Sequence, residues 1–179
     1  MGQMARTSRR RTSRTIALGA GLVIGLSVAL AAPAAAGTAQ IAGVGVLDTT
    51  GVCGSPPAGY AAFTDFTIVM SGSLDGCWYT DIQTTKDHGS PSGIYQERGE
   101  EVFVGTVDGR PAGTFATTYV FSSKWDPDVS TGAELHGSCH HPIAAGTGNG
   151  GFEGVTGRLD FKDEVATGRY LYRGHLSFR

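Results

Sequence analysis

Hydrophobic and polar residues alternate along the last quarter of the chain. Between residues 158 and 165, leucine, phenylalanine and valine alternate with charged side chains, and Asp163 is the single polar residue on the apolar side of the pattern. Between residues 170 and 178, aromatic and aliphatic side chains again fall on one parity. A period of two is typical of a strand with one buried face. Because only Ala166-Thr167-Gly168 separates the two segments, the sequence predicts a β-hairpin.

The same alternation recurs upstream and predicts an all-β chain. Turn-forming residues separate the alternating runs, and helical patterns are nearly absent, which is typical of a sandwich or a barrel. We expect a long loop at residues 48–64, a kink near Gly99, and strands near residues 39–47, 65–73, 76–84, 93–107, 113–124, 132–140, 156–165 and 169–178. The side chains expected to face the interior are Ile68, Met70, Phe115, Tyr119, Leu159, Phe161, Tyr172 and Leu176.

A glycine-rich segment precedes the predicted C-terminal hairpin. Residues 146–157 read GTGNGGFEGVTG, and this composition predicts a tight corner, since glycine accepts positive φ and close backbone approach. Gly146-Thr147-Gly148, then Phe152, then Gly157 before a strand, resembles the Gly-Thr-Gly-x-Phe/Tyr…Gly element of allene oxide cyclases and dirigent proteins. The resemblance covers most of residues 65–178. It implies a single antiparallel eight-stranded β-barrel.

The resemblance also implies a class of function. Members of this superfamily use an apolar barrel cavity to shape a reactive small molecule without a cofactor, and they are often trimers. We therefore expect a barrel that binds a hydrophobic small molecule in an apolar cavity, or a structural or binding module that forms homo-oligomers. The alternative is a cofactor-free cyclase or isomerase. The early cysteine pair and the stretch Cys139-His140-His141-Pro142 depart from the family pattern, and fold alone does not fix function.

The first 36 residues have the organisation of an export signal. Five arginines precede an uncharged apolar run from Ile16 to Ala32, and residues 33–36 (PAAA) supply the small side chains that a signal peptidase reads. We expect cleavage before Gly37 and a secreted domain of residues 37–179 without stable membrane association. An uncleaved anchor is the alternative, because the run approaches membrane-spanning length. Ser8-Arg9-Arg10 leaves twin-arginine export open beside the general secretory route.

Removal of the signal segment changes the net charge. The full chain of 179 residues has 14 Lys and Arg against 16 Asp and Glu. Five of the arginines and none of the acids lie in the first 36 residues, so the remaining 143 residues carry nine basic and 16 acidic side chains, a net charge of −7. That length fits one domain. Because no basic face is visible in the sequence, we expect no nucleic-acid partner.

Three cysteines remain in the mature chain: Cys53, Cys77 and Cys139. An exported protein is permitted disulfides, and three cysteines leave one unpaired. We expect a Cys53–Cys77 bridge, because a long loop reaches a strand more easily than two strands cross a barrel. Cys77–Cys139 is the main alternative, and three free thiols are the other.

Acid–base chemistry has four main candidates: Glu97, Glu134, Tyr119 and Asp163. A carboxyl group inside a cavity would have a raised pKa and could act as a general acid or base. Carboxylates are rarely buried, however, so the sequence favours outward positions for Glu97 and Glu134, and a solvated strand end for Asp163. Tyr119 shares its parity with two phenylalanines, which favours a place in the core. Motifs for serine hydrolases, zinc peptidases and phosphate loops are absent from the sequence.

Metal binding has little support in the sequence. Cys139 and His141 are two residues apart, about 6.6 Å along a strand, which is a feasible spacing for two ligands. His136 and His140 would share a face about 13 Å apart, too far for one ion unless a bulge intervenes. Because no second Cys/His motif completes a set, we expect neither a metal nor a cofactor.

Overall fold

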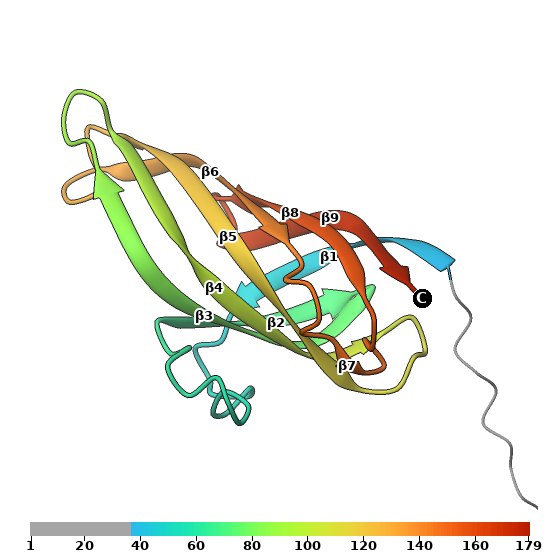
Figure 1. Ribbon diagram of the computed structural model, residues 1–179. Helices are drawn as coiled ribbons and strands as arrows, with labels where there is room; N and C mark the ends of the chain where they lie inside the picture. The colour runs from blue at the N-terminus through green and yellow to red at the C-terminus, as the bar shows by residue number, and fades with distance from the viewer. Residues whose placement is uncertain (1–36) are drawn as a thin grey trace, which may run out of the picture. The chain divides into compact units, whose positions relative to one another are not determined.

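The computed structural model describes residues 37–179, and this part of the chain is all-β. Its nine strands are joined by loops, without a helix in the described residues (Figure 1). The strands are β1 (Gly37–Leu47), β2 (Phe66–Gly72), β3 (Leu74–Asp87), β4 (Ile94–Val107), β5 (Gly113–Asp126), β6 (Ala133–Pro142), β7 (Asn149–Gly150), β8 (Thr156–Glu164) and β9 (Arg169–Phe178). No helix in residues 37–179 is long and apolar enough to cross a membrane.

Eight of these strands close into an antiparallel barrel. Neighbours pair in the order β1, β2, β3, β4, β5, β6, β8, β9, and β9 pairs with β1 to complete the circle. The short strand β7 pairs with the start of β5 outside the circle. Closure leaves none of the eight barrel strands with an unpaired edge, which is how barrels avoid edge-to-edge aggregation. The predicted eight-stranded barrel is therefore confirmed, and only β7 was missed.

The alternation of residues positions the core as the sequence predicts. All eight side chains expected to face the interior are at most 5% exposed. The hairpin at residues 165–168 also forms, with Gly168 in the left-handed region at φ +64°. The expected kink near Gly99 corresponds to a register shift in β3 between Ile82 and Thr84, opposite Gly99 and Arg98.

The glycine-rich segment closes one end of the barrel. Phe152 is fully buried, and its ring packs against Phe103 and Phe115 at centroid distances of 5.6 and 5.0 Å. A side chain at Gly151 would overlap the carbonyl oxygen of Pro111, so only glycine lets the segment approach this neighbouring loop. The Phe152 ring therefore fills this end of the barrel. Burial of such an aromatic side chain contributes several kcal/mol to folding.

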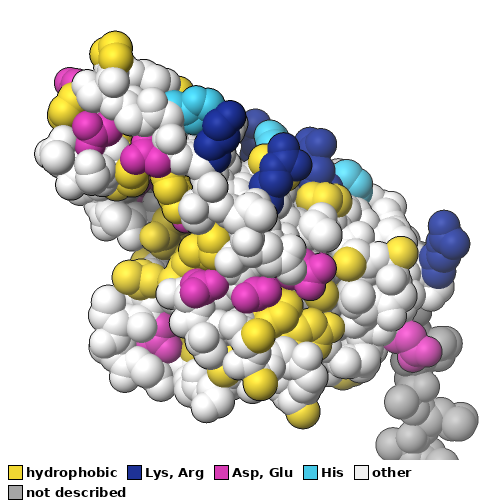
Figure 2. Space-filling model, turned by 60° about the vertical axis from the view of Figure 1, so that its left-hand side comes forward, with side chains coloured by type: hydrophobic (Ala, Val, Ile, Leu, Met, Phe, Trp, Pro, Cys, Tyr) yellow, Lys and Arg dark blue, Asp and Glu magenta, His cyan; other side chains and the backbone are white. Residues whose placement is uncertain are grey.

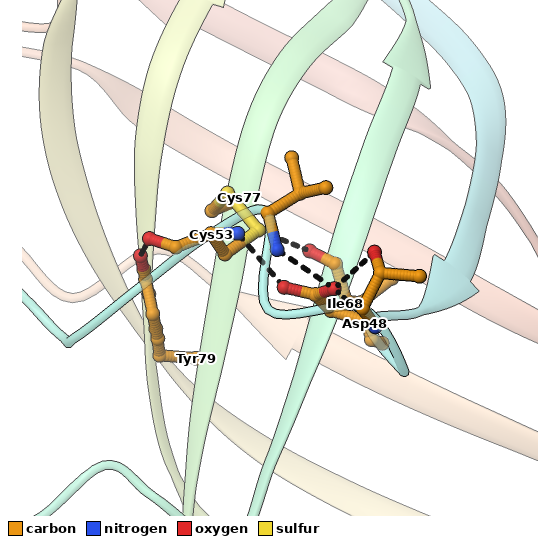
Figure 3. Close-up of a disulfide and its surroundings, with 7 residues drawn as sticks. Asp48, Cys53, Ile68, Cys77 and Tyr79 are labelled. Carbon is orange, nitrogen blue, oxygen red and sulfur yellow. Dashed lines mark hydrogen bonds between the residues drawn. A yellow bond between two sulfur atoms is a disulfide. The ribbon is translucent and has the colours of Figure 1, made fainter.

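The long loop at residues 48–64 is fixed to the outside of the barrel by a disulfide (Figure 3). Cys53 and Cys77 are bonded, with their Cα atoms 5.6 Å apart, and Cys139 is free and buried. The Tyr79 hydroxyl donates to the Cys53 carbonyl at 2.7 Å, and Phe63 from the loop packs against Tyr79 and Val102. The expected Cys53–Cys77 pairing is confirmed. It keeps a loop without regular structure attached to β3.

Basic side chains gather on the outer face of β8 and β9 and their neighbours (Figure 2). Arg158 lies opposite His175, and Asp160 lies opposite Arg173. Asp160, which accepts from both His140 and Arg158, is half-buried on this face. This basic patch is not visible in the sequence, because it combines outward positions of separate strands. The absence of a nucleic-acid partner stays a prediction.

Candidate functional site

A pocket of about 340 Å³ lies inside the barrel at the end opposite Phe152, where β1 and β8 end and β2, β4, β6 and β9 begin. Figure 2 shows a hollow in which hydrophobic side chains gather, with acidic side chains beside it. One group of lining residues is apolar or aromatic: Leu47, Phe66, Phe121, Cys139, Phe161 and Tyr170. The other group carries acidic, hydroxyl or imidazole groups: Glu97, Glu101, Tyr119, Glu134, His141 and Asp163.

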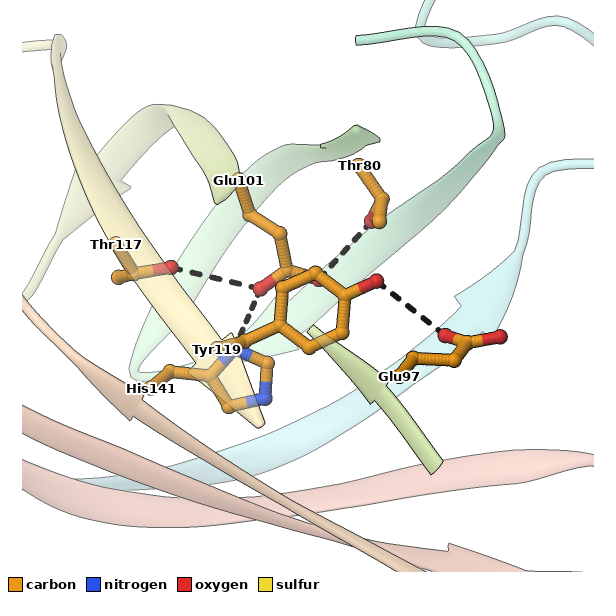
Figure 4. A network of polar contacts seen from close by, with 6 residues as sticks. All are labelled: Thr80, Glu97, Glu101, Thr117, Tyr119 and His141. Carbon is orange, nitrogen blue, oxygen red and sulfur yellow. Dashed lines mark hydrogen bonds and ion pairs between the residues drawn. The ribbon is translucent and has the colours of Figure 1, made fainter. Parts of the chain in front are cut away.

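The deepest polar group in this pocket is Glu101, which is 2% exposed (Figure 4). Its carboxylate accepts from the hydroxyls of Thr80 at 3.0 Å and Thr117 at 3.4 Å, and it is paired with Nδ1 of His141. These partners come from β3, β5 and β6, so three strands hold one carboxylate in place. A buried charge needs such partners, since an unpaired one would cost several kcal/mol.

His141 links this network to the open part of the pocket. Its ring lies almost parallel to that of Tyr119, with centroids 5.9 Å apart, and packs against Phe161 at 4.6 Å. Because a carboxylate only accepts hydrogen bonds, Nδ1 carries the hydrogen toward Glu101. Nε2 is buried and has no hydrogen-bond partner among residues 37–179. In the neutral form of the ring this nitrogen is an acceptor that the protein itself leaves unused.

Glu97 lies nearer the mouth, between two tyrosines. Tyr95 donates to one carboxylate oxygen at 2.8 Å, and Tyr119 donates to the other at 3.3 Å. Burial raises the pKa of Glu97, the two tyrosine hydrogen bonds oppose that effect, and the negative charges of Glu101 and Asp65 add to it. Burial and Glu97 also raise the pKa of both tyrosines, so these hydroxyls stay protonated and act as donors.

Glu134 and Asp163 form a carboxyl pair over Gly137. A Cβ built on Gly137 would contact Asp163 Oδ2 and Glu134 Oε1, so glycine leaves the space that the two groups share. Burial, the bond with Asp163 and the charge of Asp163 together raise the pKa of Glu134 to about 7. Burial also raises the pKa of Asp163, against the bond with Glu134, which lowers it. The pair therefore holds one proton in a range where most carboxyl groups hold none.

The four candidates from the sequence thus meet in one pocket. Glu97 and Glu134 line it, which corrects the expectation that both face outward, and Asp163 lines it too rather than ending in solvent. Tyr119 is in the core, 3% exposed, and also lines the pocket. Carboxylates are tolerated here because hydroxyl donors and a shared proton offset the cost of burial. The roles of these residues in function stay predictions.

The histidines and the cysteine considered as metal ligands lie on opposite sides of the barrel wall. Cys139 and His141 both point inward, and burial raises the pKa of the Cys139 thiol, as do the charges of Glu101, Asp163 and Glu97. His136 and His140 lie on the outer surface. Residues 37–179 contain no group of three or more His, Cys, Asp or Glu side chains arranged to hold a metal ion.

Glu101 was missed as a pocket residue, and His141 was considered only as a weak metal ligand beside Cys139. Glu101 shares the parity of Phe103, which the pattern assigns to the interior, but the neighbouring Glu100 makes the pair resemble a solvated segment. The interior of an eight-stranded barrel is typically wide enough for side chains or for one small ligand. This barrel has both, because aromatic residues fill one end and the pocket occupies the other.

The lining is also less apolar than expected, since four carboxyl groups and one imidazole share it with aromatic walls. Such a set can bind a small molecule by its apolar part, accept hydrogen bonds from it and exchange a proton with it. Comparison of the chain with family models, with curated proteins and with solved structures finds no match.

Proposed function

We propose that this protein is an exported barrel that binds a small molecule with an apolar body in the pocket at its open end. The observation that carries the proposal is the pocket itself, about 340 Å³ with aromatic walls. This volume lies at the lower end of the range for small-molecule sites, which are concave, largely apolar and contain few polar groups. Export rests on the sequence of residues 1–36, which lie outside the described residues, and the disulfide supports it.

A second candidate function is a cofactor-free cyclase or isomerase, the activity that the resemblance to allene oxide cyclases and dirigent proteins implies. One specific observation favours it: the Glu134–Asp163 pair holds a proton near neutral pH, beside the hydrogen-bonded Glu97. A general acid or base works best when its pKa lies near the operating pH. In an isomerisation the pair would return to the substrate the proton that it removes, so no other reactant is needed.

Binding can be tested by NMR titration of the ¹⁵N-labelled domain, residues 37–179, with 2-phenylethanol and related small aromatic compounds. We expect saturable shifts at residues of the pocket. Phe121→Ala removes part of the aromatic wall and should weaken binding, whereas Val120→Ala, whose side chain is 40% exposed, should leave it unchanged. Shifts confined to other surfaces, or equal loss in both variants, would contradict the proposal. Proton exchange at the α-carbon of a bound carbonyl compound would support the enzyme instead.

A further inference from the structure

The pocket is asymmetric in charge. Four carboxyl groups line it, those of Glu97, Glu101, Glu134 and Asp163, and none of its lining residues is Lys or Arg. The charges that act on Glu97 and Glu134 are those of other carboxylates, which raise the pKa values of both groups. Elsewhere in the described chain acids do have cationic partners, as Asp160 has in Arg158 and His140. In the pocket, Glu101 is paired with His141 in the same way, whereas no Lys or Arg lines the pocket beside Glu97, Glu134 and Asp163.

An acidic cluster alone does not define a site, but His141 adds an independent feature. It is 3% exposed, it lines the same pocket, and its Nε2 has no partner among the described residues. With Nδ1–H directed to Glu101, the neutral ring offers Nε2 as an acceptor. Buried polar atoms are nearly always satisfied, so an unused acceptor in a pocket indicates a missing donor.

Three hydroxyl donors in and around the pocket are already engaged with its own acids, and Tyr170 adds a further hydroxyl to the lining. The Tyr119 hydroxyl donates to Glu97, and the Thr80 and Thr117 hydroxyls donate to Glu101. What the pocket offers a ligand is consequently an excess of acceptors and negative charge, surrounded by aromatic rings. Aromatic faces also attract cations, because the face of the ring carries partial negative charge.

We propose that the ligand of this pocket is an organic ammonium compound, a protonated amine attached to an apolar or aromatic body. The ammonium group donates to Nε2 of His141 and to the carboxylates of Glu97 and Glu134, and the apolar body lies against Phe66 and Phe121. A carboxylate or phosphate ligand is excluded by the same charges. This inference rests on the proposed binding function and specifies its ligand class.

Three probes of similar size and different charge test the ligand class. They are 2-phenylethylammonium, neutral 2-phenylethanol and anionic 3-phenylpropanoate, each titrated into the ¹⁵N-labelled domain at pH 8 and low ionic strength. We expect the ammonium compound to bind at least about tenfold more tightly than the alcohol, equivalent to about 1.4 kcal/mol. The anion should bind more weakly than either. Equal binding of ammonium and alcohol, or tighter binding of the anion, would overturn the ligand class and leave the binding function standing.

Two substitutions assign the effect to the pocket. Glu97→Gln keeps the shape of the side chain and should reduce the preference for the ammonium compound several-fold with little change for the alcohol. Glu100→Gln removes the same charge from an exposed position further along β4 and should leave the preference unchanged. Circular dichroism and thermal unfolding check that both variants fold. If both variants lose the preference equally, the general negative charge of the protein explains it and the proposal fails. If no probe binds, the binding function fails with it.

Discussion

Replacement of Glu134 by glutamine should change how the stability of the barrel depends on pH. In the folded protein the pKa of Glu134 is about 7, against 4.5 for an unperturbed glutamate. The folded state therefore retains a proton that the unfolded state releases between these values, and the free energy of unfolding falls as pH rises from about 4.5 to about 7. This loss of unfolding free energy is complete above about pH 7 and absent below about pH 4.5. Because glutamine does not titrate, the Glu134→Gln variant should lack this pH-dependent loss of unfolding free energy.

The magnitude follows from the shift. At about 1.4 kcal/mol per pKa unit, the full difference corresponds to about 3 kcal/mol, and solvent screening of this half-buried side chain reduces it to about 1–2 kcal/mol. Relative to the native sequence, Glu134→Gln should therefore gain about 1–2 kcal/mol in unfolding free energy between pH 5 and pH 8.

Urea denaturation of the domain at pH 5 and pH 8 measures this difference, and Glu153→Gln, at an exposed position, serves as the matched control. Asp163→Asn should flatten the profile similarly, because the two carboxyl groups share the proton. A constant difference between Glu134→Gln and the native sequence at both pH values would refute the shared proton. A gain of equal size in Glu153→Gln would attribute the effect to overall charge.

Further predictions concern the supports of the pocket and the barrel. Gly137→Ala should separate the carboxyl pair without removing a charge, because a Cβ would contact both groups, and the pKa of Glu134 measured by NMR should fall toward 4.5. Phe161→Ala should cost about 3–5 kcal/mol of unfolding free energy, and a loss under about 1 kcal/mol would place that ring at the surface. Phe152→Ala should cost a similar amount by opening the filled end of the barrel, measured by the same denaturation. Cys53→Ser with Cys77→Ser should cost about 3 kcal/mol, and an unchanged midpoint in urea would contradict the stabilising role of the bridge.

The strands could be predicted from the sequence because their signal is local. A period of two is present within each segment, as in Leu159 and Phe161, and it specifies both the strand and its buried face. The short strand β7 was missed because two residues carry no period. Its partner is Gly113 and Thr114 in β5, and this pairing depends on the glycine-rich loop rather than on alternation.

The site could be predicted only as separate residues. Asp163 stood out because it interrupted an apolar parity, yet its partner Glu134 lies on another strand, and the proximity of the two depends on pairing between β6 and β8. Glu101 and His141 are 40 residues apart in sequence and meet because β4 and β6 both pair with β5. Composition favoured outward positions for the acids because it contains no information on the hydroxyl donors that stabilise them inside.

The most direct test of the proposed binding site is a crystal structure of the domain grown with 2-phenylethylammonium. We predict that the compound lies in the pocket, with its ring against Phe66 and Phe121 and its ammonium group within hydrogen-bond distance of His141 Nε2 or the carboxylate of Glu97. An empty pocket at saturating concentration, or a compound bound only on the outer face of the barrel, would contradict the binding of an ammonium compound at this end of the barrel.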